Sequence, residues 1–245
     1  MRPSLSLAGE EMATAIPERY RPDPIRSYLG PKQRGGWRRF AILTRRDGRI
    51  WSTLAGRVAS ILEPRLDRSV AANRTVLARD GWRVEPTETA LRRARSRAPK
   101  QGLILRTDVQ EFYASITPPV LVRVLGNLGV PPQESRLAGR MVEEWTESGY
   151  RGLPIGPVGS AVLANAVLTS VDEALSSFRF IRWVDDYVIS VPSERAAAAI
   201  LDRLDASLAR LHLRRSAPKT EVREGTGAIP WLRGNPPAFA SPAHM

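Results

Sequence analysis

Residues 180–191 read FIRWVDDYVISV, and the two adjacent carboxylates in this stretch, Asp185 and Asp186, decide how the rest of the chain is interpreted. Apolar and aromatic side chains typical of β-strands flank the pair on both sides, with no Gly, Asn-Gly or Pro between the two runs. The stretch therefore predicts a buried hairpin with two like charges at its tip. Taken alone, it is also explained by an ordinary polar turn, so the remaining sequence has to distinguish the two interpretations.

Composition places the chain among ordinary globular proteins and removes several kinds of site. Its 245 residues are 42% hydrophobic and 25% charged, enough for one large domain or two small ones with a sizeable core. There is no cysteine, so disulfides and thiolate metal sites are excluded. The two histidines, His212 and His244, argue against a histidine zinc site or a Ser-His-Asp triad. No apolar run reaches the length of a membrane span or signal peptide, so we expect no membrane association and a cytoplasmic location.

The net charge of +12 predicts a polyanionic partner. Lysine occurs only at Lys32, Lys100 and Lys219, so the basic residues are almost all arginine. A GC-rich coding sequence explains the choice of arginine over lysine, but it does not explain the excess of basic over acidic residues. We therefore expect the protein to bind nucleic acid through the phosphate backbone.

The first hundred or so residues divide into an arm and a region of mixed elements. Residues 1–37 are rich in Pro, Gly and Arg without a sustained period, which predicts an irregular basic arm. In residues 38–51, RRFAILTRRDGRIW, two apolar runs around Asp47-Gly48 predict a hairpin. A helix that ends near Pro64 and a short, very basic helix over 87–97 are expected to follow.

From residue 102 the expected order is strand, helices, two strands, helix, strand. Strands are expected at 102–109, within 180–191 and through TEVRE at 220–224, and helices at 118–130, 134–147, 160–177 and 193–213. A βαββαβ order makes an antiparallel sheet with helices on one face, which is an α+β fold. It brings Asp108, at the end of the first strand, beside Asp185 and Asp186. A carboxylate cluster at adjacent strand ends binds hard divalent cations.

Four motifs, in this order along the chain, resemble the palm motifs of reverse transcriptases. They read TDVQEFYASI (107–116), GLPIGPVGSAVLAN (152–165), RWVDDYVI (182–189) and LHLRRSAPKTEV (211–222). The resemblance covers residues 38–225 and implies an RRM-like right-hand palm at 101–225, preceded by a fingers-like region at 38–100. The tail at 226–245 is expected to be loose and is too short for the helical thumb that follows the palm in related enzymes.

The resemblance implies an RNA-directed DNA polymerase, a nucleotidyltransferase that adds dNTPs to a primer 3′-OH with two metal ions. It implies that Asp108 and Asp185 hold Mg²⁺, with Mn²⁺ as the other option, and that Asp186 supports them. Lys219 matches a lysine that protonates the leaving pyrophosphate. The alternative interpretation of Lys219 is a lysine exposed on the surface.

Tyr113 stands five positions after Asp108, where an aromatic in this family packs under the sugar of the incoming nucleotide and excludes a 2′-OH. Such exclusion selects deoxynucleotides and implies a DNA product. The alternative is that Tyr113, like its neighbour Phe112, is an aromatic of the hydrophobic core.

The second motif implies contacts to nucleotide and template. Its glycines let backbone approach a base pair closely, and the residues assigned to the nucleotide are Pro154, Gly156 and Ser160. Asn165 and Trp183 are assigned to template and primer, Trp183 standing where Tyr or Phe is usual. Ile155 replaces the Gln of the retroviral and group II intron pattern, which puts in doubt a hydrogen bond to the sugar. The LPxGPxxSxxLAN form instead resembles bacterial enzymes of the retron and phage-defence type.

The triphosphate also needs a basic clamp. Position in the chain nominates Arg45, Arg46 and Arg49 on the expected hairpin, and Arg74 resembles an arginine of the fingers. Most of these arginines are equally explained as solvated surface charge.

The expected partners are an RNA template, a DNA or RNA primer and dNTPs. Without a thumb, the grip on the duplex would have to come from a structured RNA, a partner protein or a second copy of the chain. Two other readings stay open: a palm that binds nucleic acid without turnover, and a polymerase that copies another template or none. Retroelement maintenance and antiviral defence both remain possible settings.

Overall fold

The computed structural model of the chain describes residues 20–32, 36–78, 81–99 and 101–225. The tail at 226–245 and residues 1–19 of the predicted arm lie outside these ranges. In chain order the elements are β1 (Arg26–Pro31), β2 (Trp37–Ile42), α2 (Arg45–Leu62), the 3₁₀ helix η1 (Glu63–Arg65), β3 (Thr75–Ala78), β4 (Gly81–Val84), α3 (Thr87–Arg97), β5 (Leu103–Asp108), α4 (Phe112–Ser115), α5 (Pro118–Asn127), α6 (Pro132–Glu147), α7 (Val158–Ala174), β6 (Phe180–Trp183), β7 (Asp186–Val191), α8 (Glu194–Ala209), the 3₁₀ helix η2 (Ala217–Lys219) and β8 (Glu221–Glu224).

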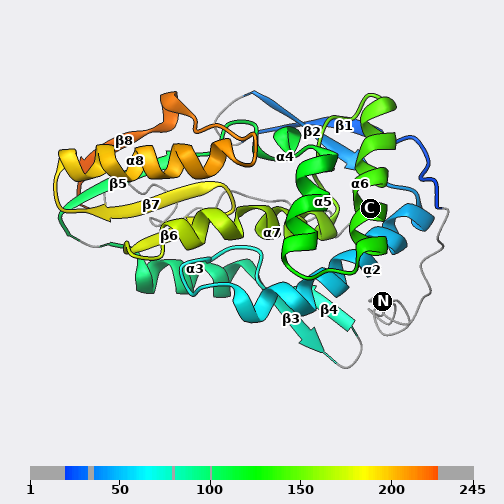
Figure 1. Cartoon of the computed structure of the whole chain (residues 1–245), viewed down its shortest axis with the longest axis horizontal. Coiled ribbons are helices and arrows are strands. Elements are labelled where there is room, and N and C mark those ends of the chain that lie inside the picture. Colours follow the sequence, from blue (N-terminus) through cyan, green and yellow to red (C-terminus); the bar gives the residue numbers. More distant parts are fainter. Residues whose placement is uncertain (1–19, 33–35, 79–80, 100, 226–245) are drawn as a thin grey trace.

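A four-stranded sheet forms one end of the molecule, in the order β6-β7-β5-β8 (Figure 1). All neighbouring strands are antiparallel, and β5, the first strand of the unit in sequence, lies between β7 and β8. The chain order is β5, helices, β6, β7, α8, β8, so the predicted βαββαβ architecture is confirmed. Ser193 caps α8, its hydroxyl accepting a hydrogen bond from the Ala196 amide, as the sequence predicts.

The helices α7 and α8 cover one face of this sheet. Alternate strand residues such as Leu105 and Ile189 point into that layer, because successive side chains of a strand face opposite sides. The other face carries Ile104, Ile181 and Val188, which pack under α3. The sequence gives no sign of this second layer, since α3 belongs to the region before the sheet.

The first part of the chain differs from its prediction. Strand β1 lies inside the segment expected to be irregular, and it pairs with β2 so that Tyr28 stands opposite Phe40. The hairpin expected over 38–51 is wrong, because its second half is the start of α2. Thr44 caps that helix: its side-chain oxygen accepts a hydrogen bond from the Asp47 amide and donates one to the Asp47 carboxylate. The Asp-Gly pair therefore opens a helix instead of a turn.

Helix α2 joins this first part to the rest of the core. Its helical spacing was predicted from Leu54 onward, and it buries that side against α6 and α7. Trp51 packs edge to face on Trp145 of α6, with ring centroids 5.0 Å apart. In Figure 1, α2, α5 and α6 gather at the end of the molecule away from the sheet.

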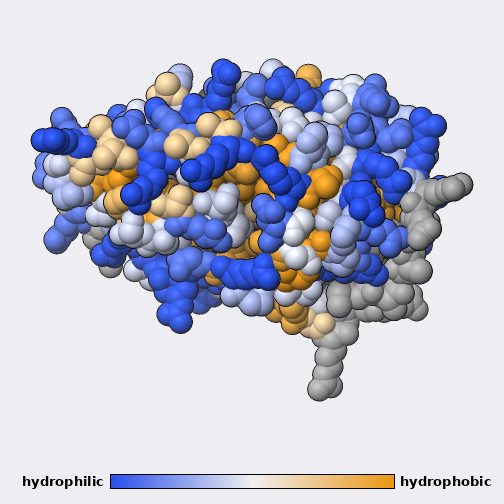
Figure 2. Space-filling model, in the orientation of Figure 1, coloured by the Kyte–Doolittle hydropathy of each residue, from blue (hydrophilic) through white to orange (hydrophobic). Residues whose placement is uncertain are grey.

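The side of the molecule drawn in Figure 2 is mainly polar. Figure 2 shows hydrophilic residues over most of the viewed side, including the part over α3, with hydrophobic residues emerging between them near the middle. Among the helices of the described ranges, none combines the length and the apolar character that a membrane crossing requires.

Candidate active site

Three carboxylates meet at one end of the sheet. In the register of β5 and β7, Asp108 stands directly opposite Asp186. The pairing continues one step further, because the Val109 amide donates to the Asp185 carbonyl at 3.1 Å. Residues 77 positions apart in the sequence, Asp108 and Asp185, are thus brought side by side by the antiparallel topology, as predicted.

Asp185 sits in a two-residue turn between β6 and β7, where Trp183 pairs with Asp186 on either side. The first turn residue, Val184, has a φ of 60°. Short hairpin turns usually place glycine at a position of this kind, because a β-branched side chain is strained in the left-handed region. The turn that presents Asp185 is therefore held in a conformation that its own sequence disfavours.

Lys219 lies against Asp108. Its ammonium, at the end of η2, donates to both oxygens of that carboxylate at 2.9 Å. Burial raises the pKa of Asp108, while the Lys219 ammonium opposes that rise. The last predicted motif thus reaches the carboxylate cluster.

Asp186 is held by Arg106, which lies two residues before Asp108 on the same face of β5. The guanidinium donates to the two carboxylate oxygens at 3.2 and 2.9 Å from Nε and Nη2. Two-pronged pairing of this kind fixes the carboxylate in the plane of the guanidinium. Arg106 was not singled out from the sequence, although its even spacing from Asp108 on a strand would have placed both on one face.

Asp185 has a strongly perturbed acidity. Burial, followed by the negative charges of Asp108 and Asp186, raises the pKa of Asp185 to about 7. Like charges held this close make ionisation of all three unfavourable unless a cation compensates them.

The donor chemistry of the cluster fits a divalent cation. The three side chains offer only carboxylate oxygens, which suit Mg²⁺ and similar hard ions, and their mutual repulsion is what such an ion relieves. Within residues 20–32, 36–78, 81–99 and 101–225, however, no three acidic or histidine side chains are gathered as the ligands of one metal ion. Lys219 and Arg106 hold the carboxylates of Asp108 and Asp186 instead.

Tyr113 borders the cluster from α4. Burial raises the pKa of Tyr113, and the charge of Asp185 adds to that rise. The positive charge of Arg38 on β2 acts on the same pKa in the opposite direction. From the sequence, Arg38 was only part of the expected hairpin at 38–51 and had no assigned role.

The glycine-rich motif forms a loop that fits between Tyr113 and β2. The Leu153 amide donates to the Tyr113 carbonyl at 2.8 Å, and the Ile155 carbonyl accepts from the Ala41 amide at 2.7 Å. Pro154 and Gly156 belong to this loop, and Gly156 has a φ of 122°. The loop therefore bonds both to the segment after β5 and to the β1–β2 hairpin.

Ser160 and Asn165, both assigned to ligands from the sequence, are buried inside the protein. Ser160 accepts a hydrogen bond from the Trp51 indole at 3.0 Å. Asn165 donates to the carbonyls of Ala72 and Asn73 at 3.2 and 3.0 Å. Their polar atoms hold α2 and the 69–74 loop in place, so direct contact with nucleotide or template would first require these bonds to break. Trp183, also assigned to the template or primer, is buried under α3.

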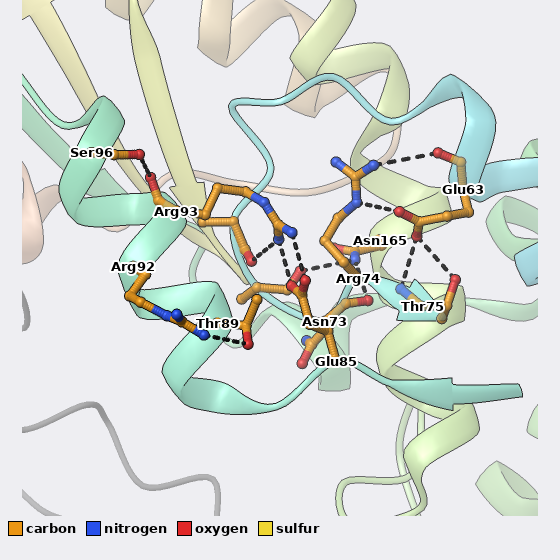
Figure 3. A network of polar contacts seen from close by, with 12 residues as sticks. Glu63, Asn73, Arg74, Thr75, Glu85, Thr89, Arg92, Arg93, Ser96 and Asn165 are labelled. Atoms are coloured by element: carbon orange, nitrogen blue, oxygen red, sulfur yellow. Dashed lines mark hydrogen bonds and ion pairs between the residues drawn. The ribbon is translucent and has the colours of Figure 1, made fainter. Parts of the chain in front are cut away.

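The arginines proposed for the triphosphate are dispersed. Arg45, Arg46 and Arg49 lie exposed on the first turns of α2, and Arg46 stands over the Tyr20 ring. Arg74 is paired with Glu63, as Figure 3 shows, and also donates to the Asp67 carbonyl. Among the described residues, no hydrogen bond or ion pair joins any of these four arginines to the carboxylates of Asp108, Asp185 and Asp186.

Comparison with known proteins identifies a family and similar folds. A family described as "Reverse transcriptase (RNA-dependent DNA polymerase)" matches residues 31–232. No curated protein matches the chain in sequence. Among solved structures, telomerase from Candida albicans, in complex with a fragment of telomeric RNA, is similar at a TM-score of 0.54 and 13% identity, over 87% of this chain and 44% of that one. Telomerase from Candida tropicalis without its C-terminal domain gives 0.56 and 12%, over 83% and 50%.

The chain spans half or less of the length of these telomerases, and the likeness to them supports the fold alone. The family match extends over most of the chain and includes all four motifs, the palm-like sheet and its three carboxylates. On that match, the chain belongs to the reverse transcriptase (RNA-dependent DNA polymerase) family.

Proposed function

We propose that the protein is an RNA-directed DNA polymerase that adds deoxynucleotides to the 3′-OH of a primer. The observation that carries the proposal is the meeting of Asp108 with Asp185 and Asp186 at the ends of two paired strands. Family membership supports the same activity. In this proposal residues 101–225 form the palm and residues 38–100 the fingers-like region, to which β1 is added.

Asp108 and Asp185 would hold Mg²⁺ or Mn²⁺, with Asp186 in support. When bound, such ions make the primer hydroxyl more acidic and neutralise charge on the leaving pyrophosphate. The protein's own part is to orient these groups. Lys219, already in hydrogen-bond contact with Asp108, would exchange that contact for the pyrophosphate and donate a proton to it. Tyr113 would close the space beside the sugar, and Arg38 would meet the triphosphate.

The substrates of this reaction would be dNTPs, a DNA or RNA primer and an RNA template. The RNA bound by the Candida albicans telomerase supports an RNA template here by analogy of fold. The net charge of +12 supports binding to a phosphate backbone. The form of the 152–165 motif supports a bacterial retroelement or phage-defence setting, in which a structured RNA or a partner protein would assist.

The test is primer extension on an RNA template with Mg²⁺ and dNTPs, comparing the wild type with Asp185→Asn. This change keeps the shape of the side chain and removes its charge. The matched control is Asp202→Asn, the same substitution on the exposed side of α8. We expect template-directed DNA from the wild type and the control, and a loss of product of at least about 10³-fold in Asp185→Asn, since electrostatic stabilisation at a reacting centre is worth that much.

A second candidate function has one observation in its favour. Lys219 and Arg106 form ion pairs with two of the three carboxylates, an arrangement that also suits a palm that binds nucleic acid and performs no chemistry. Retained binding of a primer–template with no extension, by the wild type in either Mg²⁺ or Mn²⁺, would support that function. Extension that does not follow the template sequence would indicate untemplated synthesis.

A further inference from the structure

Arg182 is a fully buried arginine directly beneath the turn that carries Asp185. Its Nη1 donates to the Val184 carbonyl at 2.8 Å and to the Asn165 side-chain oxygen at 2.9 Å. Its Nε and Nη2 donate to the Asp172 carboxylate, at 2.8 and 2.6 Å for the shortest contacts. One side chain thus links the hairpin turn to two positions on α7.

The charge of Arg182 is balanced inside the protein. Asp172 is buried too, and its carboxylate also accepts from the Tyr187 hydroxyl at 3.0 Å. Burial raises the pKa of Asp172, and the Arg182 guanidinium opposes that rise. Buried ion pairs contribute little net stability compared with apolar residues of the same size. The pair therefore calls for an explanation other than stability, and its geometry offers one.

That geometry bears on the strained residue. Val184, with its φ of 60°, is the residue whose carbonyl Arg182 binds. A valine in the left-handed region costs about 1–3 kcal/mol and persists only where surrounding contacts impose it. The next carbonyl, that of Asp185, is bound by the Val109 amide. The two peptide groups of the turn are therefore each held by a separate contact, one by Arg182 and one by Val109, which follows the strand that ends in Asp108.

The same residue also holds the loop at 69–74. The Arg182 amide donates to the Ser69 carbonyl and its own carbonyl accepts from the Ala71 amide, both at 2.9 Å. Asn165, bound to the Arg182 guanidinium, donates in turn to the carbonyls of Ala72 and Asn73. Figure 3 shows Asn165 beside Asn73 of this loop, while Arg93 donates to the Ala71 carbonyl and Arg74, the last residue of the loop, pairs with Glu63.

We propose that Arg182 is a positioning residue for catalysis, which holds the Val184–Asp185 turn in its strained conformation and ties it to the 69–74 loop. The proposal rests on the proposed function for its catalytic consequence. The structural part of the proposal, that Arg182 imposes the conformation of the Val184–Asp185 turn, does not depend on which reaction the site performs.

The test begins with Arg182→Lys, which keeps the positive charge against Asp172 but cannot reach Asp172, Asn165 and Val184 together. The matched control is Arg57→Lys, which alters an Arg–Glu134 pair between α2 and α6, away from the turn. We expect kcat for primer extension to fall about 100-fold in Arg182→Lys, because misplacement by about 1 Å can cost that much. KM for dNTP should change less than threefold, and Arg57→Lys should match the wild type.

A rescue variant separates positioning from general damage. Glycine adopts a positive φ without strain. Adding Val184→Gly to Arg182→Lys should therefore raise kcat at least about tenfold above that of Arg182→Lys alone. If Arg182→Lys does not fold, the pair Arg182→Met and Asp172→Asn removes both charges together, and the same loss and rescue are expected of it. Wild-type kcat in a folded variant of either kind, or no rescue by glycine, would overturn the proposal.

Hydrogen exchange gives a readout that needs no activity. In the metal-free protein, amides of residues 182–187 should exchange at least tenfold faster in Arg182→Lys than in the wild type or Arg57→Lys. Unchanged exchange would overturn the proposal even if the polymerase assay succeeds. An inactive wild type would instead count against the proposed function, and the exchange experiment would still decide the role of Arg182.

Discussion

Each carboxylate at the ends of β5 and β7 has a different neighbour: Lys219 for Asp108, Arg106 for Asp186, and the other two carboxylates for Asp185. Burial, together with the charges of the two neighbouring carboxylates, raises the pKa of Asp185 to about 7. The two cations also differ in exposure. Lys219 is largely exposed and free to leave Asp108, whereas Arg106 is mostly buried beside Asp186, so a substitution of Lys219 tests a mobile group and one of Arg106 a fixed one.

The first prediction concerns the proton that Lys219 would donate. Lys219→Arg keeps a cation beside Asp108, but a guanidinium holds its proton far more tightly than an ammonium and is a poor proton donor. If Lys219 is the general acid, kcat should fall about 100-fold in both Lys219→Arg and Lys219→Ala. Single-turnover extension rates measure this directly. A Lys219→Arg enzyme with the wild-type rate would show that only the charge matters, as expected of a lysine that merely pairs with Asp108.

The second prediction concerns sugar selection by Tyr113. The Tyr113 ring packs edge to face on Phe112, with centroids 5.6 Å apart, and the charge of Asp185 contributes to the raised pKa of Tyr113. Tyr113→Ala should lower the preference for dNTP over rNTP by roughly 10- to 100-fold, since a lost steric contact in a pocket is worth that much. Tyr113→Phe should keep the preference. Ratios of kcat/KM for dCTP and rCTP give the answer, and an unchanged ratio in Tyr113→Ala would place the ring in the core only.

At the level of single residues, the sequence predicted which charged side chains meet at the ends of the strands. It did not predict which polar side chains are buried by tertiary packing. The meeting of Asp108 with Asp185 and Lys219 could be predicted, because charged residues at the ends of apolar strand-like runs are easily recognised in the sequence. Ser160 and Asn165 both belong to the 152–165 motif and were assigned to ligands, yet they form hydrogen bonds with Trp51 and with a loop carbonyl. Whether a polar side chain contacts a ligand or another part of the protein depends on tertiary packing, which a single sequence does not reveal.

At the level of elements, the boundaries followed the local signals that were recognised. The basic helix expected over 87–97 is α3, and the apolar run at 102–109 is β5. The hairpin predicted at 38–51 is wrong because Asp47-Gly48, which is typical of a turn, lies in the first turn of α2, and Thr44, three residues before Asp47, is the N-cap of that helix. A threonine followed by an acid at that spacing is a helix-start signal, and the carboxylate here is buried and also accepts from the Tyr20 hydroxyl at 2.5 Å.

The third prediction tests that helix start. Thr44→Ala removes the oxygen that accepts from the Asp47 amide, and it should lower the free energy of unfolding by about 1 kcal/mol. Thr44→Ser keeps the oxygen and should lie within about 0.5 kcal/mol of the wild type. Urea denaturation followed by circular dichroism compares the three proteins. Equal stability of Thr44→Ala and the wild type would mean that the cap contributes nothing to α2.

At the level of the whole molecule, the glycine-rich loop joins the part before β5 to the catalytic sheet. It bonds to Tyr113 on one side and to β2 on the other, while Gly159 at the start of α7 lies against Trp51 of α2. A Cβ at that glycine would lie 2.9 Å from the Trp51 ring. The loop therefore fixes how β2 and its Arg38 stand relative to Asp185, which the order of elements along the sequence could not predict.

The last prediction follows from the closeness of that joint. Gly152 has a φ of 74°, and a Cβ there would lie 2.2 Å from the Tyr113 carbonyl oxygen and 2.6 Å from the Ala114 Cα. Gly149, three residues earlier, has a φ of 89° with no heavy atom within 4 Å of the same position. Alanine at either site incurs the left-handed strain of about 1–2 kcal/mol, so Gly149→Ala is a control for strain without a clash.

Gly152→Ala should therefore be less stable than Gly149→Ala by a further 1–3 kcal/mol or so, because backbone at a packed joint cannot yield as a flexible side chain does. Thermal unfolding of the two variants measures the difference. Primer extension should be lost in Gly152→Ala at temperatures where it is still folded, since the displaced backbone is that of Tyr113 beside Asp185. If the two variants unfold together and extend primers equally, the loop is not the joint that aligns β2 with the carboxylates, and the position of Arg38 must be set elsewhere.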